Sequence, residues 1–256
     1  MKAALGHCLY RCGAWRLQRW AINARHRKVL RILSAHRVIA ATGAGPAADR
    51  MALRRGSLSR SMFERAVRHL EKGYRLMSMD DALDGVDRQG QVAANALVLT
   101  FDDAYGDVWR SVYPLLQEKC IPFTVFLASD WVDRKPDILT SEQVREMAQS
   151  ELVTWGSHGV THQAFTGLDD RELQSELVRS REHIAALTGR DVRYVCYPDG
   201  RYDERVRAAV QTAGYAAACA TGRRVNTGSI DRFAMQRIPF EGEPLWRFAF
   251  RVAGRT

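Results

Sequence analysis

The sequence predicts an α/β protein built on a mostly parallel sheet of about seven strands. Short apolar runs alternate with helical patterns along the chain, which is typical of parallel strands joined by crossover helices. The 256 residues contain no internal repeat, and 46% of them are hydrophobic, so one sizeable core can form. A single domain with an N-terminal appendage therefore accounts for the chain.

The pattern of apolar residues places the elements in order. Short apolar runs predict strands over residues 28–36, 74–77, 96–101, 121–127, 152–155, 194–197, 215–220 and 237–239. Apolar residues at helical spacing predict helices over residues 61–72, 78–83, 107–116, 140–147, 169–187 and 203–213. Capping-box patterns begin three of these helices, at Ser61, Thr140 and Asp169. Small or polar residues predict loops over residues 40–55 and 87–94.

The predicted appendage is the basic segment 1–27, and residues 28–256 are expected to form the folded domain. The net charge is +9, and within residues 1–60 the only acid is Asp49. A basic segment on a nearly neutral body indicates an anionic partner: a membrane face, nucleic acid or a phosphorylated lipid carrier. Because no nucleic-acid-binding motif is present, nucleic acid is not expected. Residues 15–22 form a basic amphipathic pattern, which fits either a membrane surface or packing against protein.

The expected compartment is the cytoplasm or the inner face of a membrane, with export as the alternative. The apolar segment near the N-terminus is short and is interrupted by His7, so no cleavable signal peptide is predicted. There is also no run of about 18 apolar residues of the kind that spans a bilayer. The five scattered cysteines do not form a disulfide framework or a paired metal-ligand pattern.

Two adjacent acids, Asp102 and Asp103, follow the predicted strand 96–101. In parallel sheets, ligands and catalytic groups are found at the carboxyl ends of strands. Two carboxylates at close range repel each other, and a bound cation is the simplest way to hold them together. The alternative is that the pair only caps the helix that follows.

His158 and His162 lie four residues apart, after another predicted strand. Because Gly159 and two β-branched residues disfavour a regular helix, a tight turn is expected to bring the rings together. With one carboxylate, two imidazoles fill three positions of a tetrahedral zinc-type site and leave the fourth for water. The metal would lower the pKa of that water, and the second carboxylate would act as general base. The alternative for the histidines alone is helix capping or simple exposure as polar residues.

Thr100–Asp103 together with Ser157–His162 resembles the metal motifs of the polysaccharide deacetylases, the NodB-homology domain of carbohydrate esterase family 4. The resemblance extends from about Val29 to Ile238 and is strongest to the exopolysaccharide-type members. It implies a distorted (β/α)7 barrel and a divalent metal, zinc first, with nickel, cobalt or manganese accepted by the same ligands. It also implies a hydrolase that removes acetyl groups, N-acetyl above all, from an acetylated glycan or glycolipid. Such an enzyme would serve polysaccharide, lipopolysaccharide or glycolipid biosynthesis.

Carried over residue by residue, the resemblance assigns Asp103, His158 and His162 to the metal and makes Asp102 the catalytic base. These four side chains account for metal binding and for proton abstraction from water.

The resemblance also assigns Tyr197, Pro198 and Asp199 to the substrate and the oxyanion. The backbone N–H of Asp199, in the turn after Tyr197 and Pro198, would donate to the oxyanion that forms during acetyl transfer to water.

Several positions depart from the family pattern. Ala104 stands where glycine is usual, which matters only if its φ is positive. Cys196 stands where an arginine usually pairs with the base, so Arg193 and Arg237 are the candidates for orienting Asp102. The usual late histidine is absent, and His36, after the first strand, is the candidate for the general acid. These departures leave an alternative open: a catalytically inactive carbohydrate- or membrane-binding protein on the same fold.

Overall fold

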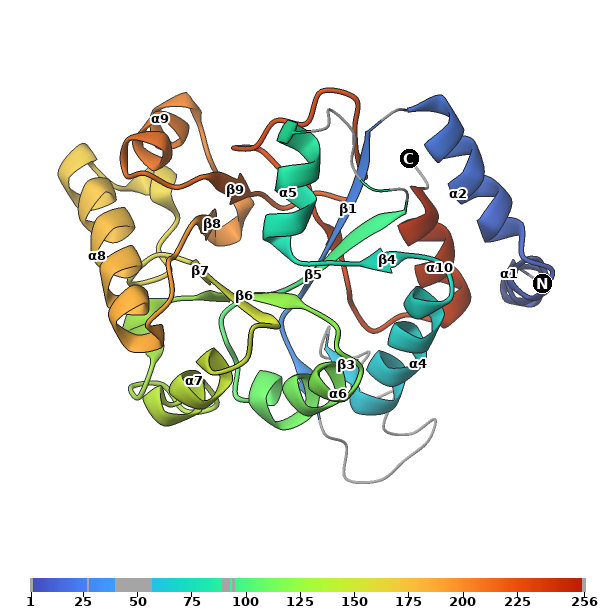
Figure 1. The fold of residues 1–256 in the computed structure, drawn as a ribbon, viewed down its shortest axis with the longest axis horizontal. Helices are drawn as coiled ribbons and strands as arrows, with labels where there is room; N and C mark the ends of the chain where they lie inside the picture. Colours follow the sequence, from blue (N-terminus) through green and yellow to red (C-terminus); the bar gives the residue numbers. More distant parts are fainter. Residues whose placement is uncertain (1, 27, 40–56, 89–92, 94, 255–256) are drawn as a thin grey trace.

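The computed structural model describes residues 2–26, 28–39, 57–88, 93 and 95–254. These residues form a curved, mostly parallel sheet with helices packed around it (Figure 1). The predicted loop 40–55 lies outside the described residues, as does most of the loop predicted at 87–94. No helix in the described part of the chain combines the length and the apolar composition needed to cross a membrane.

Six parallel strands make the body of the sheet. They are β1 (Val29–Ala35), β5 (Ala96–Phe101), β6 (Phe123–Leu127), β7 (Val153–Ser157), β8 (Tyr194–Cys196) and β9 (Ala217–Cys219). They lie side by side in chain order, each parallel to the next. Short strands extend the sheet: β4 (Arg75–Leu76), β10 (Asn226–Thr227) and β11 (Ile238–Pro239). Two further strands, β2 (Val38–Ile39) and β3 (Leu58–Ser59), pair with each other alone.

The segment 232–239 closes the sheet between its two edge strands. Met235 exchanges backbone hydrogen bonds with β9, through Ala218 (3.1 Å) and Ala220 (2.9 Å). A few residues later, Ile238 of β11 lies beside Leu33 of β1 in parallel register. The six parallel strands and β11 therefore give the predicted distorted (β/α)7 barrel, which is confirmed.

Strand register brings the two predicted motifs to the same rim. Phe101 pairs with Ala35, and the N–H of Asp102 donates to the Ala35 carbonyl at 2.8 Å. Two strands away, the N–H of His158 donates to the Leu127 carbonyl at 2.9 Å. Both motifs thus leave the sheet at the carboxyl ends of its strands, as the sequence predicts.

Helices of the αβ alternation cover the outside of the barrel (Figure 1). They are α4 (Arg60–Glu71), α6 (Tyr113–Glu118), α7 (Ser141–Ala148), α8 (Asp170–Thr188), α9 (Glu204–Thr212) and α10 (Leu245–Gly254). Between these helices and the sheet lies the larger hydrophobic cluster. The remaining helix of this alternation, α5 (Met79–Arg88), packs on the inner face of the sheet. A second cluster fills the inside of the sheet, where Ile32, Val98 and Phe126 meet Met79 and Leu83 of α5.

Two of the three predicted capping boxes are present, and one prediction is wrong. Thr140 and Asp169 each cap their helix reciprocally with the residue three positions on. Ser61 does not begin α4; the side chain of Ser59 accepts the Met62 N–H instead, at 3.2 Å. The reason is that β3 ends at Ser59, so the helix starts as soon as the strand stops.

The helix predicted from residue 107 is divided at Pro114. Val108–Val112 form a π-helix, and α6 begins at Tyr113 with the proline in its first turn. Proline lacks a backbone N–H and is tolerated where a first-turn N–H would have no partner. The wider π-turn before it accommodates the change of helical path.

The basic N-terminal segment forms two helices, α1 (Lys2–Arg11) and α2 (Ala14–Arg25), which pack on α10. Gly6 lies against the Trp246 ring so closely that a Cβ would come within 2.6 Å of it. Trp15 is buried in the main cluster, and Arg19 donates to the Gly73 carbonyl. One face of this helical hairpin therefore packs against its own domain.

His69 of α4 is buried beneath the hairpin. Its Nδ1 lies 3.2 Å from the Tyr10 hydroxyl, and its ring centroid lies 4.4 Å from that of Trp15. Burial, together with the positive charges of Arg19, Arg16 and Lys72, lowers the pKa of His69 from 6.5 to about 4. The imidazole is therefore neutral in the folded protein at pH values where it would be charged in the unfolded chain.

We predict that this histidine makes the folded state lose stability in acid. Between pH 6.5 and about 4 the unfolded chain binds a proton that folded His69 does not, so stability falls as pH falls. The loss amounts to at most about 3 kcal/mol. Urea unfolding at several pH values should show that the free energy of unfolding depends less steeply on pH in His69→Phe than in the natural protein. His183→Phe, at an exposed site on α8, should leave the dependence unchanged, and equal slopes in all three proteins would contradict the prediction.

Candidate metal centre

The acid pair sits in a left-handed turn at the end of β5. Asp103 has φ +65° and Ala104 has φ +54°, a region that residues with a Cβ adopt only at a cost of about 1 kcal/mol. The Ala104 carbonyl accepts the Leu139 N–H at 2.9 Å, which fixes the turn. The alanine that replaces the usual glycine is therefore not neutral here. Asp102 and Asp103 are both buried by this arrangement.

The histidine pair lies on the loop after β7, which is not helical. Gly159 has φ +79° and His162 has φ +67°, so the chain turns sharply between the two rings. Their centroids lie 4.6 Å apart with the planes at 86°. The turn therefore brings the imidazoles together, as the sequence predicts.

Glu176 of α8 holds this loop, and sequence reasoning missed it. Its carboxylate accepts the N–H groups of Val160 (2.6 Å) and Thr161 (3.1 Å) and the Thr161 hydroxyl (2.8 Å). The available signal was an acid at position 176 on the apolar face of the predicted helix, between Leu173 and Leu177.

Three ligand atoms converge at the rim. The Asp103 Oδ1 atom lies 3.2 Å from His162 Nε2 and 3.7 Å from His158 Nε2. This oxygen is buried and has no hydrogen-bond partner among the described residues. A buried carboxylate oxygen without a partner is costly unless a cation satisfies it. Asp103, His158 and His162 are one of the two metal-competent groups found in the described part of the chain.

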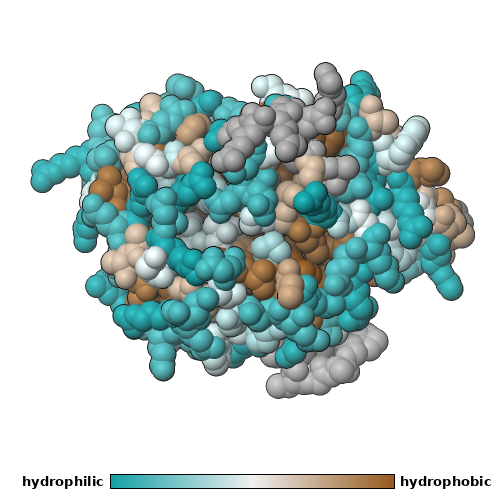
Figure 2. All heavy atoms as spheres, in the orientation of Figure 1, coloured by the Kyte–Doolittle hydropathy of each residue, from teal (hydrophilic) through white to brown (hydrophobic). Residues whose placement is uncertain are grey.

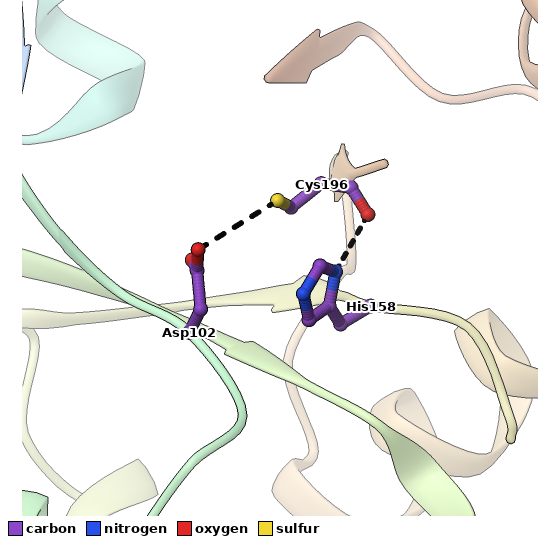
Figure 3. Close-up of side chains that lie close together, drawn as sticks. All are labelled: Asp102, His158 and Cys196. Carbon is purple, nitrogen blue, oxygen red and sulfur yellow. Dashed lines mark hydrogen bonds between the residues drawn. The ribbon is translucent and has the colours of Figure 1, made fainter. Parts of the chain in front are cut away.

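The tautomer of His158 leaves its Nε2 atom free to bind a metal. Its Nδ1 lies 2.7 Å from the Cys196 carbonyl oxygen, which only accepts, so Nδ1 carries the proton (Figure 3). Burial lowers the pKa of His158, which keeps the ring neutral, whereas the Asp103 carboxylate raises the pKa of His162. A histidine that donates through one nitrogen to a carbonyl and presents the other is typical of metal sites. The residues present therefore fit a divalent cation with nitrogen and oxygen ligands.

The second metal-competent group, Asp102, His158 and Cys196, fits less well. Its Cys196 Sγ lies 4.0 Å from Asp102 Oδ2 (Figure 3). Burial raises the pKa of the Cys196 thiol well above its usual value, so the sulfur stays protonated and is a poor ligand. In addition, the Arg237 guanidinium already lies 2.9 Å from this sulfur.

Asp102 is held by Arg237 and is separated from the metal group by that contact. The two guanidinium nitrogens of Arg237 donate to the two Asp102 oxygens at 2.6 and 2.8 Å, and both side chains are buried. Burial alone would raise the pKa of Asp102, but the Arg237 charge outweighs it and holds the pKa below its usual range. Arg237 reaches the site from the closing segment, where it also donates to the Ala220 carbonyl at 3.1 Å.

Arg193, the other candidate for orienting Asp102, does not contact it. Its guanidinium pairs with Asp80 of α5, and the neighbouring Tyr194 hydroxyl donates to the same carboxylate at 2.6 Å. The physical reason is strand direction: Arg193 precedes the first residue of β8, whereas Asp102 follows the last residue of β5, so the two lie toward opposite ends of the parallel sheet.

The remaining predicted residues differ in their access to the rim. His36 is exposed, with its Nε2 atom 3.8 Å from Asp102 Oδ2. Asp199 is exposed in the turn after β8, with φ +57°. Pro198 is buried beside it. The Tyr197 ring is also buried, stacks on Tyr202 and donates its hydroxyl to the Phe233 carbonyl at 2.8 Å. The Tyr197 side chain therefore supports the turn, and its assignment to the substrate stays a prediction.

The fold and the site together define an α/β barrel with a candidate metal centre at its carboxyl rim. The polysaccharide deacetylase family model matches residues 89–218, a span that includes both motifs. The chain belongs to this family.

Relatives of known sequence show how far the likeness extends. YxkH of Bacillus subtilis (strain 168) is 27% identical over 168 residues, which cover 66% of this chain and 60% of that protein. The poly-beta-1,6-N-acetyl-D-glucosamine N-deacetylase of Escherichia coli (strain K12) is 32% identical over 107 residues, covering 34% of this chain and 16% of the relative. The chain thus spans less than two thirds of the length of either relative.

Solved structures share the fold. The Streptococcus pyogenes deacetylase PplD, in complex with acetate, has a TM-score of 0.78 at 17% identity. The aligned region covers 89% of this chain and 99% of the PplD chain. IcaB from Ammonifex degensii has a TM-score of 0.73 at 20% identity, with 89% and 98% covered. At these identities the likeness establishes the barrel architecture.

We predict that Asp103 and His162 are needed to bind a divalent metal and that Asp102 is not. Isothermal titration of chelator-treated protein with Zn2+ should show at least about tenfold weaker binding in Asp103→Asn, which loses the negative charge of its ligand, and in His162→Ala, which loses a ligand atom. Asp102→Asn, one residue away and held by Arg237, should bind about as tightly as the natural protein. Equal affinity in all four proteins would refute the assignment.

Proposed function

We propose that the protein is a metal-dependent carbohydrate N-deacetylase, which hydrolyses acetyl groups of an acetylated sugar in polysaccharide, lipopolysaccharide or glycolipid biosynthesis. The observation that carries the proposal is that the two adjacent carboxylates have different partners. Asp103 faces two imidazole nitrogens, whereas Asp102 is paired with Arg237. One carboxylate is thereby available to a metal and the other to a proton.

Asp103, His158 and His162 are the residues that would hold the metal, with zinc as the first expectation. A bound divalent cation supplies Lewis acidity at the acetyl carbonyl and lowers the pKa of water. These three side chains meet that role because they offer one carboxylate oxygen and two imidazole nitrogens within 4.8 Å of one another.

Asp102 is the proposed general base. Arg237 keeps its carboxylate ionised and fixes both oxygens, so the orientation toward the reacting water is set before the substrate binds. A carboxylate whose pKa is lowered is a weak base, which means that it accepts the proton only from an acidified water. His36, whose Nε2 lies within 3.8 Å of Asp102 at the exposed rim, is the proposed donor of a proton to the leaving amine.

The Asp199 N–H is the proposed donor to the oxyanion. The positive φ of Asp199 turns the backbone at the exposed end of β8, close enough for its carboxylate to act electrostatically on His162. A backbone donor fixed by a tight turn needs no reorganisation when charge develops on the carbonyl oxygen.

The sugar acetamide is the proposed substrate because of the named relative. The Escherichia coli relative at 32% identity is an N-deacetylase of poly-beta-1,6-N-acetyl-D-glucosamine, which favours N-acetyl over O-acetyl groups. An acetylated glycan or a glycolipid is the corresponding partner here. The cytoplasm or the inner membrane face remains the predicted place of action, with export as the alternative.

The second candidate function is a catalytically inactive carbohydrate- or membrane-binding protein on this fold. Cys196 and the missing late histidine favour it. Against it, Arg237, just before β11, supplies the guanidinium that Cys196 does not, and the Asp102 carboxylate retains a bidentate partner.

We predict that acetate release requires both the metal and Asp102. Chelator should abolish release of acetate from a panel of N-acetylated glycans, and Zn2+ should restore it. Asp102→Asn should reduce kcat by about 10²-fold or more, the typical contribution of a general base. Activity that survives chelator, or a fully active Asp102→Asn variant, would favour the binding protein instead.

We also predict that Arg237 positions the base. Arg237→Lys loses bidentate geometry, so kcat should fall at least about tenfold while KM and Zn2+ affinity change little. The matched control is Arg193→Lys, which alters the ion pair with Asp80 and should leave kcat unchanged.

A double variant distinguishes a role of Arg237 in positioning Asp102 from a role in stabilising the fold alone. Because Cys196 Sγ lies 2.9 Å from the guanidinium, the double variant Cys196→Arg with Arg237→Ala can place a guanidinium near the same carboxylate. Recovery of kcat above the level of Arg237→Ala alone supports positioning by charge. No difference between the two variants, with both folded, would argue against it.

A further inference from the structure

The outer faces of α1 and α2 expose large apolar side chains. Among the described residues, Leu5 (62% exposed), Leu9 (40%), Leu17 (71%) and Trp20 (69%) are the exposed large hydrophobic residues, and all four lie on these two helices. Figure 1 places α1 and α2 at one edge of the molecule beside α10, and Figure 2 shows hydrophobic atoms at that edge. A concentration of this kind marks an interaction surface.

The exposed residues of α2 form a stripe. Leu17, Trp20, Ala21 and Ala24 are all exposed and recur at helical spacing, so they line one side of the helix. The opposite side carries the buried Trp15 and packs on α10. The helix therefore has two apolar sides, of which the fold uses only one.

The charges around the stripe have one sign. Residues 1–28 contain seven lysines and arginines and no acid. Arg11, Arg16 and Arg25 are exposed, and none of them forms an ion pair with any described residue. Cations without an acidic partner, beside exposed leucine and tryptophan, are the features of a helix that lies in an anionic interface.

The corner of the hairpin adds a basic pocket. An open cavity of about 270 Å³ lies where α1, α2 and α4 meet. It is lined by Tyr10, Arg11, Cys12, Gly13, Trp15, Arg16, His69 and Lys72. α2 starts beside it without a side-chain cap, so the positive end of the helix dipole faces the same place. The positive charge of the exposed face thus continues into this cavity through Arg11, Arg16 and Lys72.

We propose that the hairpin of α1 and α2 is a docking surface for an anionic phospholipid bilayer. Leu17 and Trp20 enter the boundary between headgroups and acyl chains, where tryptophan is favoured. Arg11, Arg16 and Arg25 lie at the level of the lipid phosphates, where each cation strengthens partitioning about fivefold. This docking is independent of acetyl hydrolysis and places the barrel at a membrane surface.

A bilayer fits this surface better than other occupants do. A second copy of the chain would bring two faces of the same positive charge together, which is unfavourable. Nucleic acid would meet the arginines but would leave the leucine side chains in water. An anionic bilayer satisfies the charge and the apolar stripe at once.

Vesicle co-sedimentation of the full chain tests the proposal. The protein should bind vesicles of phosphatidylglycerol and phosphatidylcholine, bind phosphatidylcholine alone at least about tenfold more weakly, and be released by salt. Leu17→Gln with Trp20→Gln should weaken binding at least about tenfold, as should the triple change of Arg11, Arg16 and Arg25 to Gln. The matched control changes three exposed arginines elsewhere, Arg171, Arg179 and Arg224, to Gln and should bind normally.

Each other outcome overturns the proposal. Equal binding of all variants, or none to any vesicle, shows that the hairpin is not a lipid surface. Self-association that disappears in Leu17→Gln with Trp20→Gln assigns the face to a second copy. Loss of binding is interpreted only for variants whose thermal unfolding and Zn2+ affinity match those of the natural protein. If the variant with Leu17→Gln and Trp20→Gln does not fold, the variant with Leu5→Gln and Leu9→Gln replaces it.

Discussion

The ion pair between Arg237 and Asp102 is the contact on which the site depends. It joins the closing segment of the barrel to the end of β5, across 135 residues of sequence, with both groups buried. Removing one partner of such a pair leaves a buried charge and typically costs about 3–5 kcal/mol. The cost of burying the pair is offset because Arg237 also donates to the Ala220 carbonyl and the Thr100 hydroxyl. The same contact that closes the barrel therefore also orients the carboxylate at its rim.

This contact also explains how two adjacent acids remain side by side. Two carboxylates in one buried turn would normally force one of them to take up a proton. Here each carboxylate faces different groups: Asp102 pairs with the Arg237 guanidinium, and the Oδ1 atom of Asp103 faces the Nε2 atoms of His158 and His162. The turn that carries them accepts positive φ at Asp103 and Ala104, a strain of the kind that persists where the surrounding structure holds it in place.

In the proposed docking, the N-terminal hairpin combines two roles that the sequence alone left as alternatives. Its inner side is part of the fold, through Trp15 and the contacts of α2 with α10. Its outer side carries exposed Leu17 and Trp20 among cations, and nothing in the described part of the chain covers it. A helix that is anchored on one side can present the other without losing its position, which is what docking a rigid barrel on a surface requires.

The sequence by itself determined the alternation of strands and helices, the rim at which Asp102, Asp103, His158 and His162 emerge, and the family. These follow from local pattern and from covalent adjacency to a strand end, which a parallel sheet converts into proximity. Only the tertiary structure decided that Arg237 and not Arg193 meets Asp102, that Glu176 holds the histidine loop, and that the Tyr197 ring is buried. Those outcomes depend on which side of a strand or helix a residue faces and on contacts between distant segments, and neither can be read from neighbours in the chain.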